Sequence, residues 1–404
     1  MNFKFIGGVL IIIGTCLGAG LLALPVSNSP GGFAYTTAIM IFIWAVTTLG
    51  ALYILELTQW LPPGTNLVSI AKATLGRRAE VIAWIAYLML CYSLLSAYIS
   101  GGADIFHEIL GLLKLSVSRP VVAFIFTFTL GYIVYRGVRS LDMINRGFMV
   151  VKFSAFFLLI FLIFPHISPD NLKHRDIGLA LSAVSVAVSS FGFAVVIPSL
   201  LSYFEGNVMK VRAIIFCGSL IPLACYIIWD IVIIGTLPRT GPDSLMSILS
   251  SGDATSGLVN SLQHVLNSMI VNDASEVFAS ICILTSFLGV SLALFDFLSD
   301  GLKLDKGTKK GRIKPWLLTF IPPLVIVTVY PKMFILALSY AGLCVAVLSI
   351  LLPSFMVWNG RYITGIAKNY RVFGGKTMIL VEIFAGFFIL VIGMLESFGI
   401  VKYL

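Results

Sequence analysis

Eleven apolar runs dominate this sequence of 404 residues, and most of them are close to 20 residues long. A helix needs about 20 mostly apolar residues to cross the roughly 30 Å of hydrocarbon in a bilayer. The sequence therefore predicts an all-α polytopic membrane protein with eleven transmembrane helices. The expected spans lie near Phe5–Pro25, Phe33–Leu57, Val81–Gly101, Val121–Tyr135, Phe148–Pro165, Ile177–Tyr203, Ile214–Leu237, Val277–Leu298, Trp316–Tyr330, Met333–Trp358 and Met378–Phe398.

The composition excludes the other broad classes of protein. Hydrophobic residues make up 59% of the chain and charged residues only 11%, whereas a soluble globular protein has about 25% charged residues. This is too little charge to cover a soluble surface, and too much apolar content for a disordered chain. The basic residues lie in short connections between apolar runs, so the net charge of +9 indicates membrane orientation and no nucleic-acid partner. All four histidines also lie in connections, so we expect no metal site and no cofactor.

The distribution of lysine and arginine predicts how the chain is oriented. With the N-terminus in the cytoplasm, 19 of the 27 basic residues fall in inner segments and seven in outer ones, and Lys152 alone lies within a span. Positive residues favour the cytoplasmic side. We therefore expect a cytoplasmic N-terminus, a C-terminus outside, and a first span that is a retained helix and not a cleaved signal peptide.

Two of the expected spans contain helix breakers at membrane depth. The first contains Gly14, Gly18 and Gly20 and ends at Pro25, and the sixth contains the run SSFGFAVVIPS. Broken helices in a membrane are tolerated where the freed backbone groups line a cavity or bind something. The two spans are five apart and so cross in opposite directions, as in the two inverted halves of a transporter. Close helix packing by small residues is the alternative interpretation.

Several runs along the chain carry a family resemblance. They are GTCLGAGLLALP in the first span, AYISGGADI at Ala97–Ile105, the Lys of VVKFSAFFLL, SSFGF with PSLLSY in the sixth span, TSFLGVSLALFDFLSD at Thr285–Asp300, FIPPL at Phe320–Leu324, and YPKMF with LSYAG. In these runs the sequence resembles the bacterial aromatic amino-acid permeases of the amino acid/polyamine/cation superfamily, most of all the tyrosine-specific branch.

The resemblance implies a fold, a location and a function. It implies one LeuT-type transporter domain over residues 1–404, with five spans in residues 5–165, their inverted repeat in residues 177–358 and an extra span at residues 378–398. It also implies import of an aromatic L-amino acid, tyrosine first, by proton symport with alternating access across the bacterial inner membrane. Tryptophan, serine or threonine as substrate, and sodium as coupling ion, stay open as alternatives. The oligomeric state is not predicted.

A free amino acid carries two charges, and both need partners when it leaves water. Freed amides at the start of the second half of the first span suit the carboxylate, and these belong to Gly18, Ala19 and Gly20. Carbonyls for the ammonium group are expected in both broken spans, at Gly14, Thr15, Ser190, Phe191, Gly192 and Phe193. The side-chain slot has six aromatic candidates, which are Phe191, Phe193, Tyr92, Tyr98, Phe295 and Tyr340.

The resemblance also implies how transport is coupled. In proton-coupled relatives a lysine of the fifth span takes the place of a sodium ion between spans 1, 5 and 8, and Lys152 matches it here. The matching neighbours are carbonyls between Gly14 and Leu17 and the hydroxyls of Thr285 and Ser286. Because Lys152 lies only about 6 Å from the expected start of its span, a side chain that extends back to the interface is the alternative.

Other functions and other ionisable residues receive simpler interpretations. We find no HExxH or GxSxG motif of the kind that a membrane enzyme needs, and an internal inverted repeat is not typical of a channel.

Five more acidic residues lie toward the ends of spans, where a side chain reaches water or headgroups at low cost. They are Glu56, Asp230, Asp296, Glu382 and Glu396.

Overall fold

The computed structural model describes residues 3–62, 65–112, 114–136, 138–252, 254–302, 304, 309–367 and 370–397. Within these ranges every regular element is a helix, so the predicted all-α class is confirmed for the described part of the chain. The expected end of the last span at Phe398 lies outside the described residues, as do several of the basic residues counted for orientation, such as Lys303 and Lys402.

The helices follow the predicted spans closely. The α-helices are α1 (Phe3–Cys16), α2 (Gly20–Asn28), α3 (Phe33–Thr58), α4 (Leu67–Leu75), α5 (Arg77–Leu112), α6 (Arg119–Arg136), α7 (Val138–Ile163), α8 (Ile177–Ala180), α9 (Val184–Ser190), α10 (Ile197–Tyr203), α11 (Val208–Thr236), α12 (Leu245–Ser251), α13 (Ala254–Leu266), α14 (Met269–Gly301), α15 (Lys309–Val329), α16 (Phe334–Val345), α17 (Leu352–Tyr362) and α18 (Gly375–Ser397). Short 3-10 helices occur at η1 (Phe164–His166), η2 (Asn171–Lys173), η3 (Leu181–Ala183) and η4 (Gly192–Val196), and a π-helix occurs at η5 (Ala346–Leu351).

Length and apolar composition identify the segments that can cross a membrane. In the described ranges nine helical segments are long and apolar enough, and α1 together with α2 makes a tenth candidate that is bent by 50°. The helix Arg119–Tyr135 is apolar but shorter. These segments coincide with the eleven expected spans, whereas the crossing number of eleven and the inverted repeat remain predictions.

Both spans that carry helix breakers are interrupted in the structure. In the first, α1 ends at Cys16 and α2 begins at Gly20 after a bend. In the sixth, α9 ends at Ser190, Phe191 is non-helical, and η4 leads into α10. Pro198 fits at the start of α10 because a proline there gives up no helical hydrogen bond.

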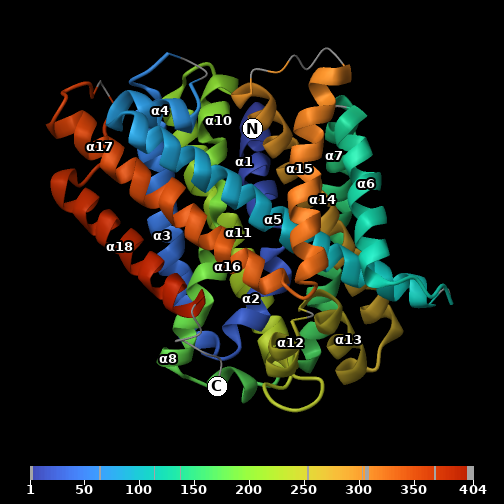
Figure 1. Ribbon diagram of the computed structural model, residues 1–404. Coiled ribbons are helices and arrows are strands. Elements are labelled where there is room, and N and C mark those ends of the chain that lie inside the picture. Colours follow the sequence, from blue (N-terminus) through green and yellow to red (C-terminus); the bar gives the residue numbers. More distant parts are fainter. Residues whose placement is uncertain are drawn as a thin grey trace.

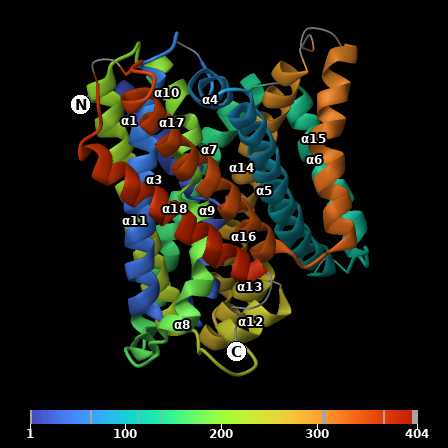
Figure 2. The same ribbon diagram turned by 60° about the vertical axis from the view of Figure 1, so that its left-hand side comes forward.

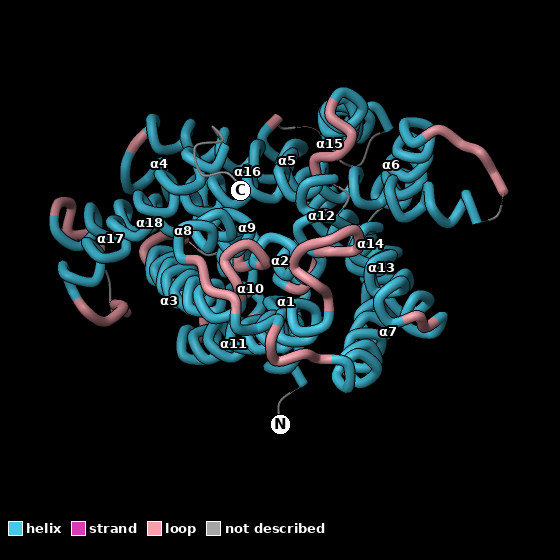
Figure 3. Tube along the Cα trace, turned by 90° about the horizontal axis from the view of Figure 1, so that it is seen from below, coloured by secondary structure: helices cyan, strands magenta, loops and turns pink. Residues whose placement is uncertain are grey.

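The interrupted helices lie in the middle of the bundle (Figure 3). Helix α2 packs against α9 and α11, and α1 packs against α11 and η4. Helices α6 and α18 lie on opposite flanks (Figure 1). On the flanks large apolar side chains are exposed, among them Phe161 at 77% and Phe384 at 75%, which suits contact with lipid tails.

Two glycines let the tenth span approach its neighbours closely. A Cβ atom on Gly342 of α16 would lie 1.9 Å from the Ser185 carbonyl oxygen of α9, and one on Gly50 of α3 would lie 1.8 Å from that of Ser349 in η5. Neither position has room for a side chain, so the backbones themselves are in contact there. The loop after α11 folds into α12 and α13, which lie at the lower end of the bundle in Figure 2 and pack against α2.

Candidate functional site

The break in the first span frees backbone groups in the centre of the bundle. The Leu17 N–H makes the last helical bond of α1, to Ile13 O at 2.8 Å, and the Gly18 N–H turns back to Cys16 O at 2.8 Å. The carbonyls of Cys16 and Leu17 therefore point out of the helix, where each accepts a hydrogen bond from a side chain of another helix.

Lys152 of α7 supplies the donor for Leu17. Its Nζ lies 2.6 Å from Leu17 O and 3.4 Å from Thr285 Oγ1 of α14, and its side chain is only 2% exposed. The Thr285 hydroxyl donates to Ile281 O at 2.8 Å, which leaves its lone pairs for the ammonium. The alternative of a side chain that extends to the membrane interface is therefore wrong, because Lys152 points into the bundle and joins three spans.

Tyr226 of α11 supplies the donor for Cys16, and the sequence analysis did not single it out. Its Oη lies 2.6 Å from Cys16 O and 3.2 Å from Ser190 O, so one hydroxyl bridges the breaks of both interrupted spans. The Phe191 ring packs edge-on against the Tyr226 ring with centroids 5.4 Å apart. The only sequence signal is a hydroxyl group deep inside an apolar span.

Glycine is required at the break because the neighbouring spans approach the backbone directly. A Cβ atom on Gly18 would lie 2.2 Å from Ser286 Oγ, and one on Gly20 would lie 2.6 Å from Ser190 Oγ and 2.9 Å from Tyr226 Oη. Of the three amides expected to be free, that of Gly18 is not, because it donates to Cys16 O at 2.8 Å, whereas the N–H groups of Ala19 and Gly20 make no backbone hydrogen bond within the described residues. They lie at the start of α2, and such a helix start suits an anion.

The other candidate residues of the two broken spans surround this break without closing on a common ligand position. Thr15 is exposed and its hydroxyl donates to Ile11 O at 2.8 Å, while the Ser190 hydroxyl donates to Val186 O at 2.9 Å. Gly14 faces Met149, and Gly192 faces Val345 of α16.

The aromatic candidates differ in whether they lie at the sixth-span break and in how far they are buried. Phe191 and Phe193 are fully buried at the sixth-span break, and Tyr98 is 6% exposed with its hydroxyl beside that of Ser286. The structure does not bring Tyr92 to the break, because its hydroxyl donates to Leu318 O of α15 at 2.9 Å. Two further candidates differ in burial, since Phe295 is 4% exposed and Tyr340 is 40% exposed.

The expectation that acidic residues in the spans reach water is wrong for three of them. Glu56, Asp230 and Glu382 are at most 1% exposed. Glu56 is bound by the Arg361 guanidinium, with Nε 2.7 Å from Oε1, and its Oε2 accepts the Val372 N–H at 2.7 Å. The position of these residues along their spans therefore predicted their exposure incorrectly, because their side chains turn toward neighbouring helices.

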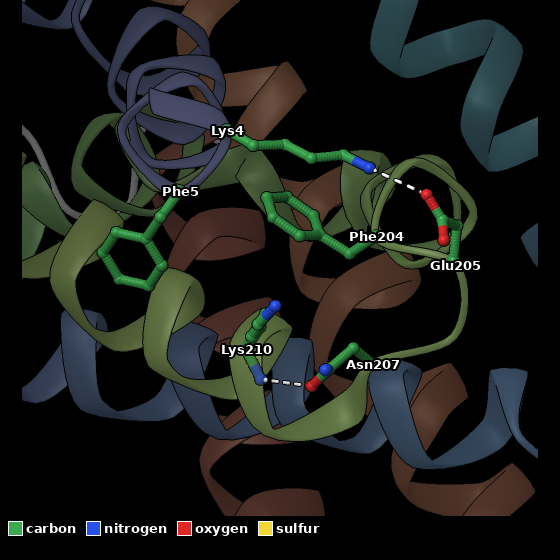
Figure 4. Close-up of a pocket in the computed structure, with 6 residues that line it drawn as sticks. All are labelled: Lys4, Phe5, Phe204, Glu205, Asn207 and Lys210. Atoms are coloured by element: carbon green, nitrogen blue, oxygen red, sulfur yellow. Dashed lines mark hydrogen bonds and ion pairs between the residues drawn. The ribbon is translucent and has the colours of Figure 1, made fainter. Parts of the chain in front are cut away.

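A solvent-facing pocket of about 330 Å³ lies at the start of α1 and the end of α10 (Figure 4). Its lining residues are Lys4, Phe5, Phe204, Glu205, Asn207 and Lys210. Lys4 Nζ lies 2.9 Å from Glu205 Oε1, and this hydrogen-bonded ammonium lowers the pKa of the Glu205 carboxyl. The pocket is separate from the break, because twelve residues of α1 at 1.5 Å each place Cys16 about 18 Å from Lys4.

Comparison with known proteins identifies the family. The chain matches the tryptophan/tyrosine permease family over residues 1–393. It is 35% identical over 385 residues to the tyrosine-specific transport system 1 of Haemophilus influenzae, a match that covers 95% of this chain and 94% of the relative. It is also 31% identical to a tryptophan-specific transport protein of Shigella flexneri (98% and 96% covered) and 28% identical to a glutamine transporter 2 of Aliivibrio fischeri (97% and 99% covered). A family match over nearly the whole length, on a helical bundle with nine helices able to span a membrane among the described residues, shows that this chain belongs to the tryptophan/tyrosine permease family of membrane transport proteins.

Proposed function

We propose that this protein imports an aromatic L-amino acid, tyrosine first, together with a proton across the bacterial inner membrane. The family match and the tyrosine-specific relative at 35% identity support the substrate class. The contact of Lys152 with the broken first span is the observation that carries the coupling part of the proposal.

We propose that eleven spans form two inverted five-helix halves and one extra helix, with a cytoplasmic N-terminus and an outside C-terminus. Interrupted helices in spans 1 and 6 that meet at the centre of the bundle support this arrangement. Alternating access then exposes the same central site to each side in turn. In this orientation the Lys4–Glu205 pocket opens on the cytoplasmic face.

The substrate site is proposed at the junction of the two breaks. The carboxylate of the amino acid binds the free N–H groups of Ala19 and Gly20, where the dipole of α2 favours a negative charge. The ammonium group binds carbonyls in the segments from Gly14 to Thr15 and from Ser190 to Phe193. The aromatic ring of the substrate is proposed to pack against Phe191, Phe193 and Tyr98.

Lys152 is proposed as the group that takes up and gives up the coupled proton. When it is charged, its ammonium donates to Leu17 O and Thr285 Oγ1, joining spans 1, 5 and 8. When it is neutral, this attraction weakens and the first span is freer to move. One proton imported with a zwitterion moves one net charge, which contributes about 2.3 kcal/mol per 100 mV of membrane potential.

Uptake into proteoliposomes tests the coupling. The purified protein is reconstituted, and accumulation of radiolabelled tyrosine is measured with an imposed pH gradient, an imposed sodium gradient, or neither. We expect accumulation above equilibrium with the pH gradient in sodium-free buffer. Liposomes without protein are the control, and a strict requirement for sodium would reject proton symport.

Competition tests the substrate. Excess unlabelled tryptophan, phenylalanine, serine, threonine or glutamine is added during uptake of labelled tyrosine, because relatives named for tryptophan and glutamine exist. We expect inhibition by the aromatic amino acids. Absence of tyrosine uptake, or inhibition of that uptake by serine, threonine or glutamine but not by tryptophan or phenylalanine, would reject the aromatic preference. A single hydroxyl partner in the pocket changes the preference between aromatic side chains by orders of magnitude.

A further inference from the structure

A buried amide–carboxyl pair joins the second half of the first span to the seventh. Asn28 is the last residue of α2 and Asp230 lies on α11, and both are 0% exposed. The Asn28 Nδ2 donates to Asp230 Oδ2 at 2.5 Å. This pair lies beyond Tyr226 on α11, one helical turn further from the Lys4 pocket, and no hydrogen bond or ion pair among the described residues connects it to Lys152.

The second oxygen of each side chain in the pair lacks a hydrogen-bond donor. Asp230 Oδ1 and Asn28 Oδ1 are both buried and have no hydrogen-bond partner within the described residues. Both are acceptors, and two acceptors cannot satisfy one another. A proton on the carboxyl group makes it a donor to the amide oxygen and completes a doubly hydrogen-bonded acid–amide ring. Turning the amide by 180° would put its oxygen against Asp230 Oδ2, and that arrangement needs the same proton.

No basic side chain is bonded to Asp230 within the described part of the chain. The main elements packed against α11 are α1, α2, α3, α7, α10, η1 and η2, and Trp229 of α11 also packs against Phe278 of α14. The titratable side chains of these elements within the described part are Lys4 and Cys16 of α1, Tyr35, Tyr53 and Glu56 of α3, Lys152 of α7, His166 of η1, Lys173 of η2, Tyr203 of α10, and Asp273, Glu276, Cys282, Asp296 and Asp300 of α14; the side chains of residues 138–146 in α7 lie outside it. Past the end of α11, Arg239 and His174 both contact Pro30 O, two residues beyond Asn28, and not Asp230.

The basic members of this set are bound elsewhere or, like His166, are exposed. Lys4 pairs with Glu205, Glu56 with Arg361, Lys152 with Leu17 O, and Lys173 with Asp170. Helix α2 carries no titratable residue at all. An ionised carboxyl that is fully buried without a cation is strongly unfavourable, and such a group takes up a proton instead.

We propose that Asp230 and Asn28 form a second proton-binding site, distinct from Lys152. The bound proton stabilises the contact between α2, the second half of the first span, and α11, the seventh span. Loss of this proton leaves a carboxylate facing the bare oxygen of Asn28, and the contact between α2 and α11 loosens. The consequence for transport rests on the proposed function, because it assumes that the first span moves. The proton site itself does not depend on that function.

Infrared difference spectroscopy of the purified protein tests the proton directly. A protonated carboxyl group gives a carbonyl band that disappears on ionisation, so a pH titration reports it without any substrate. We expect Asp230→Asn to lose one such band. Glu382→Gln removes another fully buried carboxyl of the spans, and this matched control keeps the Asp230 band. Identical protonated-carboxyl bands in the wild type and Asp230→Asn would overturn the proposal.

A second variant and a salt control cover the other outcomes. Asn28→Leu keeps Asp230 but removes its partner, so the band should move in frequency and titrate at a different pH. An unmoved band would show that Asn28 does not share the proton, which also overturns the proposal. A band that is lost when sodium chloride, but not choline chloride, is added at constant pH would assign the two oxygens to a sodium ion instead.

Exchange of labelled for unlabelled tyrosine across proteoliposomes tests the consequence. Asp230→Asn keeps a neutral, complementary pair at every pH, since its amide donates to Asn28 Oδ1. We expect its exchange rate to lose a pH-dependent component that the wild type and Glu382→Gln retain. If the wild type shows the Asp230 band but Asp230→Asn has the same pH profile of exchange as the wild type, the role of this proton in holding the two helices together is overturned. If the parent requires sodium, only the proton symport fails, and the band is unaffected.

Discussion

Replacing Gly20 with alanine should weaken binding of the amino acid without unfolding the protein. The added Cβ would lie 2.6 Å from Ser190 Oγ and 2.9 Å from Tyr226 Oη, and real Cβ atoms do not approach oxygen so closely. Both hydroxyls have to move. Ser190 then gives up its bond to Val186 O and Tyr226 its bond to Cys16 O, so the two breaks lose the groups that hold them in place.

The size of the effect follows from those two bonds. A neutral hydrogen bond contributes about 0.5–1.5 kcal/mol to stability, so losing both costs about 1–3 kcal/mol, the same range as overpacking a well-filled core. If this cost falls on the conformation that binds the amino acid, the apparent affinity decreases by about 5- to 150-fold.

Equilibrium binding of labelled tyrosine to purified protein measures the effect, with thermal unfolding as the test of folding. The matched control is Gly289→Ala, a glycine of α14 whose added Cβ would meet no atom within 4 Å. Alanine is favoured over glycine inside a helix by about 1 kcal/mol, so this variant should be at least as stable and bind normally. A folded Gly20→Ala protein with unchanged affinity would refute the reasoning, as would an equal loss in the control.

Substitutions at three further contacts test each contact separately. Lys152→Ala should bind labelled tyrosine yet fail to accumulate it on a pH gradient; undiminished pH-driven accumulation would reject the role of Lys152. Tyr226→Phe keeps the ring but loses the bond to Cys16 O, so thermal unfolding should show a loss of about 1 kcal/mol; an equally stable variant would contradict the bridge. Glu56→Ala leaves Arg361 buried and unpaired, which should cost about 3–5 kcal/mol. Adding Arg361→Met should recover part of that loss, and an additive double variant would argue against the pair.

The sequence was informative about the helices because membrane crossing depends on a property that is local in the chain. Runs of apolar residues predicted where spans lie, and three glycines predicted that the first one breaks. Boundaries were less accurate where a helix continues beyond the hydrocarbon. Helix α14 begins at Met269, eight residues before the expected Val277, because amphipathic turns at its start are invisible to a search for apolar runs.

The site was harder to predict because contacts between spans depend on which way each side chain turns. Position along a span estimates depth, but burial of Asp230 and Glu382 depends on the facing helices. Tyr226 had only a weak local signal, its hydroxyl group inside an apolar span, since its partner Cys16 lies 210 residues away. Lys152 stood out in the sequence as the only basic residue within a span, but its coupling role came from the resemblance; its depth alone suggested a side chain that reaches the interface.

The two carbonyls freed by the first break bear on the choice of coupling ion. In transporters with broken helices such carbonyls coordinate sodium, but here Cys16 O accepts from Tyr226 and Leu17 O from Lys152. A carbonyl that already accepts a strong hydrogen bond has less to offer a cation, and an ammonium beside it repels one. In the proposed mechanism a proton needs no such ligands, since its arrival and departure would change the charge of Lys152 itself. The free N–H groups proposed for the carboxylate belong to Ala19 and Gly20, two and three residues after the Leu17 carbonyl that Lys152 binds. In that mechanism this short stretch of chain would link substrate binding to the coupled proton.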